Sequence, residues 1–137
     1  MHDVFAGGGQ PPIHLTETES DIVGSLALQA EHNQPVVAAM LLSEIERAEI
    51  HRDDRLPDGV VTLGAEVDFV DENSCRLQTV KLVMPGEANI SIGQISILTP
   101  MGAALYGLSV GQGIDWPDRS GRPRRIRILA VRKPVSN

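Results

Sequence analysis

The sequence is poor in cysteine and aromatic residues, and it has no long hydrophobic run. Cys75 is the single cysteine among 137 residues, which excludes an internal disulfide and fits a reducing compartment. Aromatic residues make up 3% of the chain, too few for the exposed rings on which single-stranded nucleic acids stack. The chain has no apolar run of about 18 residues and no signal peptide, so we expect a soluble cytoplasmic protein without membrane contact.

Signatures of catalysis and of metal binding are also missing. The histidines, His2, His14, His32 and His51, are scattered, and none forms a His-x-x-x-His pair. No Gly-x-Ser-x-Gly elbow and no phosphate-binding loop occurs. Acidic residues cluster in predicted turns and on helix faces, where we expect them to be solvated. The sequence therefore predicts no catalytic residue, no metal site and no cofactor.

Acidic and basic residues are unevenly divided along the chain. The net charge is −6, but residues 1–75 hold 15 acidic and 3 basic residues, and residues 76–137 hold 3 acidic and 9 basic ones. The two parts therefore carry net charges of −12 and +6. Such polarity says little about the fold, but it can orient a protein on a charged partner.

Two amphipathic segments near the N-terminus predict a helical hairpin. Apolar residues recur at helical spacing over residues 17–32 and again over 35–51. The letters "TETE" predict a capping box, in which Thr16 accepts from the first turn and Glu19 reaches back. Because the connection is short, we expect an antiparallel hairpin, a short coiled coil, over residues 15–52.

The segments on either side of this hairpin have a different character. Residues 1–14, rich in glycine and proline, are expected to form a loose tail. From residue 60 the apolar period changes to two, which predicts an antiparallel sheet with one short helix over residues 60–133. Its last two strands form a hairpin with the turn at 118–121. The fold class is therefore α+β.

The stretch "ISILTPMGAALYGLSVGQ", residues 95–112, carries a resemblance to a known family. A strand runs directly into Thr99-Pro100, and a short helix follows. Together with "VGQGIDWPDRSGRPRRIRILAV", it resembles the C-terminal domain of the bacterial Gre transcript-cleavage factors, which has an FKBP-like fold. The segments "LLSEIERAEI" and "LPDGVVTLGAEVDF" extend the resemblance over residues 14–132, to the Gre-related family of the regulator of nucleoside diphosphate kinase, Rnk.

The resemblance implies a protein that binds RNA polymerase at the rim of its secondary channel. By position it implies docking through one segment: Ser96, Leu98, Thr99, Pro100 and Met101. The residue before a proline is held extended, so Thr99-Pro100 is expected to form a rigid corner. The alternative is that Pro100 only begins a helix that covers the sheet.

The tip of the predicted hairpin differs from that of the Gre factors. Those factors carry two acids at the tip, which hold a metal ion at the polymerase centre. Here the tip is Glu31, His32, Asn33 and Gln34, with one carboxylate. We therefore expect no cleavage activity and no enzyme. An FKBP-like fold also raises prolyl isomerisation, but the few, dispersed aromatic residues cannot line a proline pocket.

Basic residues crowd the last hairpin. Alternation places Ile126, Ile128 and Ala130 inward and Arg125 and Arg127 outward. This row either balances the acidic hairpin or contacts an acidic polymerase surface or RNA. We expect no sequence-specific contact with nucleic acid.

The expected function is that of a non-catalytic transcription regulator which competes with Gre factors for RNA polymerase. The alternative is a small regulator of a metabolic enzyme, such as a nucleoside diphosphate kinase, that acts by direct binding.

Overall fold

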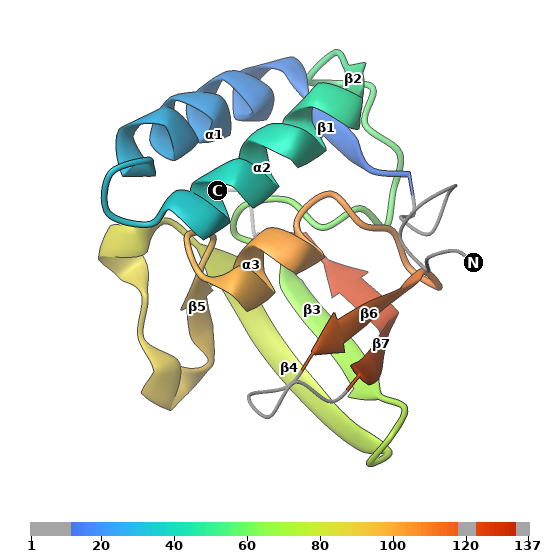
Figure 1. The fold of residues 1–137 in the computed structure, drawn as a ribbon. Coiled ribbons are helices and arrows are strands. Elements are labelled where there is room, and N and C mark those ends of the chain that lie inside the picture. Colours follow the sequence, from blue (N-terminus) through green and yellow to red (C-terminus); the bar gives the residue numbers. More distant parts are fainter. Residues whose placement is uncertain (1–11, 118–122, 134–137) are drawn as a thin grey trace, which may run out of the picture.

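A pair of antiparallel helices covers one side of a curled sheet (Figure 1). The computed structural model describes residues 12–117 and 123–133. Helix α1 (Glu17–Ala30) and helix α2 (Pro35–Arg47) form the predicted hairpin, and α2 lies between α1 and the short helix α3 (Pro100–Leu105). The predicted α+β class is confirmed. No described helix has the length and apolar character needed to cross a membrane.

The base of the hairpin is closed by two short parallel strands that the sequence did not predict. Strand β1 (His14–Thr16) pairs with strand β2 (Glu49–His51). The second helix was predicted to reach residue 51, but it ends at Arg47 because Ala48 is extended, with ψ 150°. Ile13, near the end of the predicted tail, is 1% exposed and belongs to the core. Residues 1–11 of that tail lie outside the described part.

The C-terminal sheet contains five strands in the order β5-β4-β3-β7-β6. Their bounds are β3 (Glu66–Asp71), β4 (Arg76–Val83), β5 (Gln94–Ser96), β6 (Gly113–Pro117) and β7 (Pro123–Arg132). The sheet is mixed rather than purely antiparallel, because β5 runs parallel to β4. The connection over residues 84–93, with the 3₁₀ turns η1 (Pro85–Glu87) and η2 (Ile90–Ile92), returns the chain far enough for this pairing. The predicted turn at 118–121 lies outside the described residues.

A β-bulge in β7 changes which residues face the core. Phe69 pairs with Ile128, whereas the preceding Asp68 pairs with Ala130, so Leu129 is an extra residue opposite this step. Ile126 and Ile128 face inward as predicted. Ala130 was also predicted to face inward, but it lies opposite the outward-facing Asp68. Simple alternation fails here because the bulge shifts the register by one residue.

The helices and the sheet share one hydrophobic core. The same cluster of buried side chains contains Val23 of α1, Leu41 of α2, Phe69 of β3 and Leu105 of α3. The division into a tail that ends at residue 14, a hairpin that ends at residue 52 and a sheet domain that begins at residue 60 stays a prediction. The shared core shows that the hairpin packs on the sheet domain instead of standing away from it.

Candidate functional site

The predicted docking segment forms a tight corner between β5 and α3. The Thr99 side chain caps α3: its Oγ1 accepts from the Gly102 amide at 3.1 Å and donates to the Ser96 carbonyl at 2.7 Å. The Ser96 hydroxyl in turn accepts from the Leu98 amide at 2.9 Å. Pro100 occupies the first turn of α3, where its missing N–H has no helical partner to lose. These bonds fix the corner locally, as the Thr-Pro pair predicted.

The five predicted docking residues divide into two kinds. Ser96 is only 7% exposed, and the Thr99 side chain is used in the cap, so these two shape the corner from inside. Pro100 is exposed, and Leu98 and Met101 are half-buried against the edge of the core. The surface available to a partner is therefore Leu98, Pro100 and Met101, which we call the corner surface.

Gly102 is essential to this corner, and the sequence analysis did not single it out. A Cβ placed on Gly102 would lie 2.2 Å from the Ser96 carbonyl oxygen, closer than any real contact. Only glycine lets the first turn of α3 approach the end of β5 this closely. The glycine inside the predicted helix "PMGAAL" was the available signal, because a glycine there costs helix stability without a packing reason.

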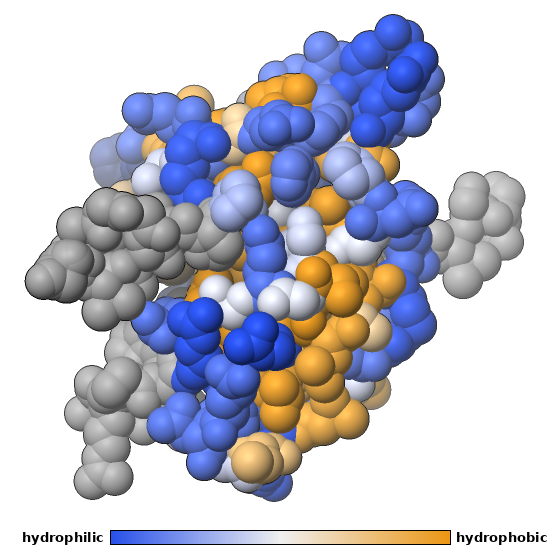
Figure 2. Space-filling view, turned by 90° about the vertical axis from the view of Figure 1, so that its right-hand side faces the viewer, coloured by the Kyte–Doolittle hydropathy of each residue, from blue (hydrophilic) through white to orange (hydrophobic). Residues whose placement is uncertain are grey.

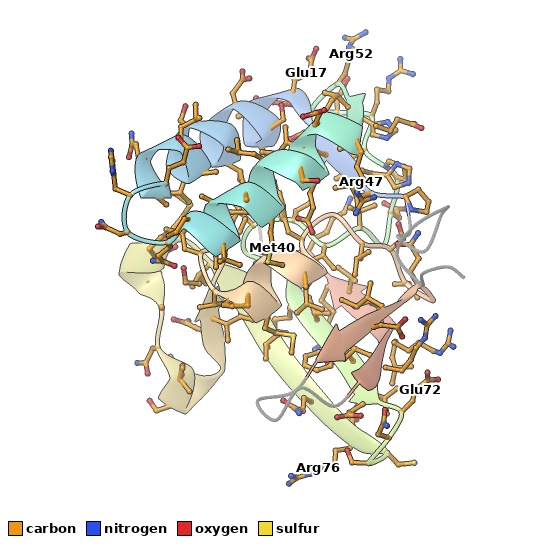
Figure 3. The ribbon with its side chains drawn as sticks, viewed as in Figure 1. Glu17, Met40, Arg47, Arg52, Glu72 and Arg76 are labelled. Atoms are coloured by element: carbon orange, nitrogen blue, oxygen red, sulfur yellow. The ribbon has the colours of Figure 1, made fainter. Side chains whose placement is uncertain are left out.

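Helix α2 forms a groove beside the corner that contains a perturbed carboxyl group. The groove is lined by Pro35, Val36, Ala39, Met40, Ser43 and Glu44. Met40 lies between α2 and α3 (Figure 3). Burial raises the pKa of Glu44 to about 8, and the opposing effect of the nearby Arg47 is smaller. The Glu44 Oε1 atom is buried and has no hydrogen-bond partner among the described residues. This burial is contrary to the solvated carboxylate that the sequence pattern predicts.

Glu19 does not complete the predicted capping box. The first half is present, because the Thr16 hydroxyl accepts from the Glu19 amide at 3.1 Å. The Glu19 carboxylate instead accepts from the Tyr106 hydroxyl at 2.7 Å and from the Leu63 amide at 3.2 Å. Burial, and then the Glu19 charge, raise the pKa of Tyr106 above its usual range. Glu19 therefore connects α1 to the end of α3, a long-range partner that local spacing could not reveal.

The hairpin tip carries one carboxylate, as the sequence indicates. Helix α1 ends at Ala30, and Glu31, His32, Asn33 and Gln34 are all exposed. The 14 residues of α1 correspond to a length of about 21 Å at 1.5 Å per residue.

Four basic residues near the C-terminus, Arg125, Arg127, Arg132 and Lys133, are paired with nearby acids of the sheet and its loops. Arg127 contacts Glu72 at 3.1 Å, and Arg132 contacts Asp68 at 2.8 Å. Hydrogen bonds from Arg132, and then from Thr79, lower the pKa of Asp68 to about 2. Further ion pairs join Arg125 to Asp115, Arg132 to Glu66 and Lys133 to Asp58. These pairs do not balance the acidic helical hairpin as predicted, because their partners lie in the sheet and its loops, and contact with a polymerase surface or RNA stays a prediction.

The sheet also presents apolar side chains that the sequence did not predict as a surface. Leu77 on β4 and Leu129 at the bulge of β7 are 63% and 46% exposed. Figure 2 shows hydrophobic side chains gathered over the lower part of one face, beside hydrophilic ones.

Two of the scattered histidines come together at the base of the hairpin. His14 Nδ1 lies 3.0 Å from His51 Nε2, although 37 residues separate them in the chain. His32 lies at the exposed hairpin tip, and His2 lies outside the described residues.

Comparison with known proteins agrees with the fold and with the predicted resemblance. Residues 56–133 match the family model "Transcription elongation factor, GreA/GreB, C-term". The chain is 28% identical over 122 residues to the regulator of nucleoside diphosphate kinase of Escherichia coli K12, with 89% of this chain and 90% of that protein covered. It is 34% identical over 130 residues to the transcription elongation factor GreA of Sinorhizobium medicae, with 89% and 82% covered.

A solved structure gives the same result. The GreA/GreB transcription elongation factor from Nitrosomonas europaea superposes with a TM-score of 0.73 at 32% identity, and the match covers 90% of this chain and 99% of that one. The family assignment thus rests on sequence and on structure, and it spans both the helical pair and the sheet. The chain belongs to the GreA/GreB transcription elongation factor family.

Proposed function

We propose that this protein binds RNA polymerase near its secondary channel and regulates transcription without stimulating transcript cleavage. The family supplies the class of partner, because its members are transcription elongation factors. The observation that carries the proposal is the corner surface, in which an exposed proline lies between two half-buried apolar side chains. The turn beneath it is held by three hydrogen bonds of the Ser96 and Thr99 hydroxyl groups. A turn that is already ordered loses little conformational entropy when a partner binds.

The absence of a cleavage function is proposed from the tip of the hairpin. Mg²⁺ takes oxygen ligands, and the resemblance to the Gre factors implies that a pair of acids at the hairpin tip is needed to hold it at the polymerase centre. Glu31 is the one carboxylate among the four tip residues. We expect this protein to occupy the site of a Gre factor and leave stalled RNA uncut. RNA shortening in stalled elongation complexes, dependent on this protein, would contradict this part of the proposal.

The corner surface is tested by substitution of its exposed proline. Pro100→Ala removes the ring but keeps a residue that helices accept, so the fold is retained while the contact area falls. Pro57→Ala is the matched control, because Pro57 is an exposed proline in the loop before the sheet. We expect weaker binding to core RNA polymerase for Pro100→Ala and unchanged binding for Pro57→Ala. Equal affinity of the Pro100 variant and the wild type would remove the corner from the interface.

A second candidate function follows from one of the relatives. The Escherichia coli protein that aligns over 90% of its length is named a regulator of nucleoside diphosphate kinase. Direct binding to such a kinase is a separate proposal from polymerase docking. Co-purification with purified kinase distinguishes the two, because the polymerase proposal predicts no retained kinase.

A further inference from the structure

The base of the helical hairpin holds a compact group of two imidazoles and one carboxylate. In the β1–β2 pair His14 lies opposite Glu49, and His51 lies two residues further along β2. The His14 Nδ1 and His51 Nε2 atoms are 3.0 Å apart, and His51 Nε2 is 3.2 Å from Glu49 Oε2. One ligand atom from each of the three residues lies within 4.8 Å of the other two. We propose that His14, Glu49 and His51 form a binding site for a divalent transition metal ion such as Zn²⁺.

Two of the three separations between these atoms are close to what such an ion requires. Zinc binds imidazole nitrogen and carboxylate oxygen at about 2.0–2.2 Å, so the ligand atoms of a tetrahedral site are about 3.3 Å apart. The two short separations in this group differ from that value by a few tenths of an ångström. Small rotations of these side chains, above all of the exposed Glu49, are enough to reach metal geometry.

Hydrogen bonding alone satisfies this group poorly. A carboxylate only accepts, so the contact with Glu49 requires His51 Nε2 to carry a proton. That proton then has to serve both Glu49 Oε2 and His14 Nδ1. A metal ion would instead accept a lone pair from all three atoms at once.

The residues that carry the ligands are held by the fold. The His14 amide donates to the Gly107 carbonyl at 3.0 Å, and the Glu49 amide donates to the Ile13 carbonyl at 3.0 Å. Leu15, the middle residue of β1, is buried in the core and holds the strand in place. The site nevertheless opens to solvent, because the Glu49 side chain is 67% exposed while that of His51 is 15% exposed. An ion can therefore enter from the Glu49 side, where a fourth ligand such as water would complete the shell.

The ligand types indicate which ions to expect. Imidazole suits Zn²⁺, Co²⁺, Ni²⁺ and Cu²⁺, whereas Mg²⁺ and Ca²⁺ prefer all-oxygen sites. Because β1 precedes α1 and β2 follows α2, a bound ion would fasten the two ends of the hairpin together. Binding of an ion to the folded protein alone would also raise the melting temperature.

The test uses the full chain, freed of metal with a chelator and titrated with Zn²⁺ by calorimetry. We expect one equivalent to bind, a rise in melting temperature, and an intense visible absorption typical of tetrahedral sites when Co²⁺ is used instead. His14→Gln and His51→Gln should each lower the affinity at least about tenfold, since even the loss of an outer-shell partner costs that much. His32→Gln is the matched control and should bind as the wild type does.

Several results would overturn the site. One is the absence of Zn²⁺ binding at micromolar concentration, and another is an equal affinity for Zn²⁺ in the wild type and in both histidine variants. A third is loss of Zn²⁺ binding in His2→Gln alone. If circular dichroism shows that either histidine variant does not fold, Glu49→Gln replaces it. This substitution should not disturb the fold, because the Glu49 side chain is mostly exposed and glutamine differs from it only in carrying a neutral amide. Unchanged affinity in a folded Glu49→Gln protein would exclude the carboxylate from the site.

Discussion

Substitution of Glu44 by glutamine should make the protein more stable at neutral pH. The carboxyl group of Glu44 is largely buried on α2, and its Oε1 atom has no hydrogen-bond partner among the described residues. Burial raises the pKa from its ordinary value of 4.5 to about 8, so the fold favours the protonated form. Above the unfolded-state pKa, folding has to take up a proton, and this costs free energy.

The sign and size of the effect follow from the two pKa values. Below about pH 4.5 both states are protonated, and the full stability is present. As the pH rises from 4.5 to 8, stability is lost at about 1.4 kcal/mol per pH unit, so the cost at pH 7 is about 3 kcal/mol. Glutamine has nearly the same shape and stays neutral. For a chain of this length, 3 kcal/mol corresponds to a rise in melting temperature of about 10 °C.

Thermal unfolding of the wild type and Glu44→Gln between pH 4.5 and 8 measures this difference. The two melting temperatures should converge at the acidic end and diverge as the pH rises. Glu46→Gln is the matched control, because Glu46 is exposed on the same helix, and its difference from the wild type should stay small throughout. Parallel pH profiles of the wild type and Glu44→Gln would refute the buried, protonated carboxyl group.

Three further predictions concern the contacts that shape the fold. Gly102→Ala should lower the free energy of unfolding, measured by urea titration, by about 2–3 kcal/mol, because the added Cβ would collide with the Ser96 carbonyl of β5. An unchanged free energy of unfolding would contradict this close approach. Tyr106→Phe leaves the Glu19 carboxylate with one fewer donor and should cost about 1–3 kcal/mol, an effect that should disappear in a Glu19→Ala background, where the acceptor is already gone. Arg132→Ala should raise the pKa of Asp68 from about 2 toward its ordinary value of 3.8 in an NMR titration; an unchanged pKa would mean that the ion pair does not form in solution.

The helical pair and the sheet could be predicted because their signals are local. Apolar spacing over residues 17–32 and again over 35–51 indicated α1 and α2. The change of period at residue 60 indicated the sheet. The Thr99-Pro100 pair likewise predicted the corner, since the extended residue before a proline is a property of the dipeptide itself.

Most of the errors involve partners that are distant in the chain. The end of α2 was misplaced because β2 forms only through pairing with β1, which lies before α1. The inward placement of Ala130 was wrong because a bulge in β7 leaves no mark in the alternation of the sequence. Glu19 was assigned a local cap because its partner Tyr106 is 87 residues away. Nor does any spacing rule bring His14 next to His51.

Docking on RNA polymerase can be tested by a pull-down with purified core enzyme, with a Gre factor added as competitor. We predict that the polymerase retains this protein and that increasing amounts of the Gre factor displace it. Retention without displacement would place the contact elsewhere on the polymerase. Absence of retention at micromolar concentration would contradict the claim and leave the family resemblance as a shared fold.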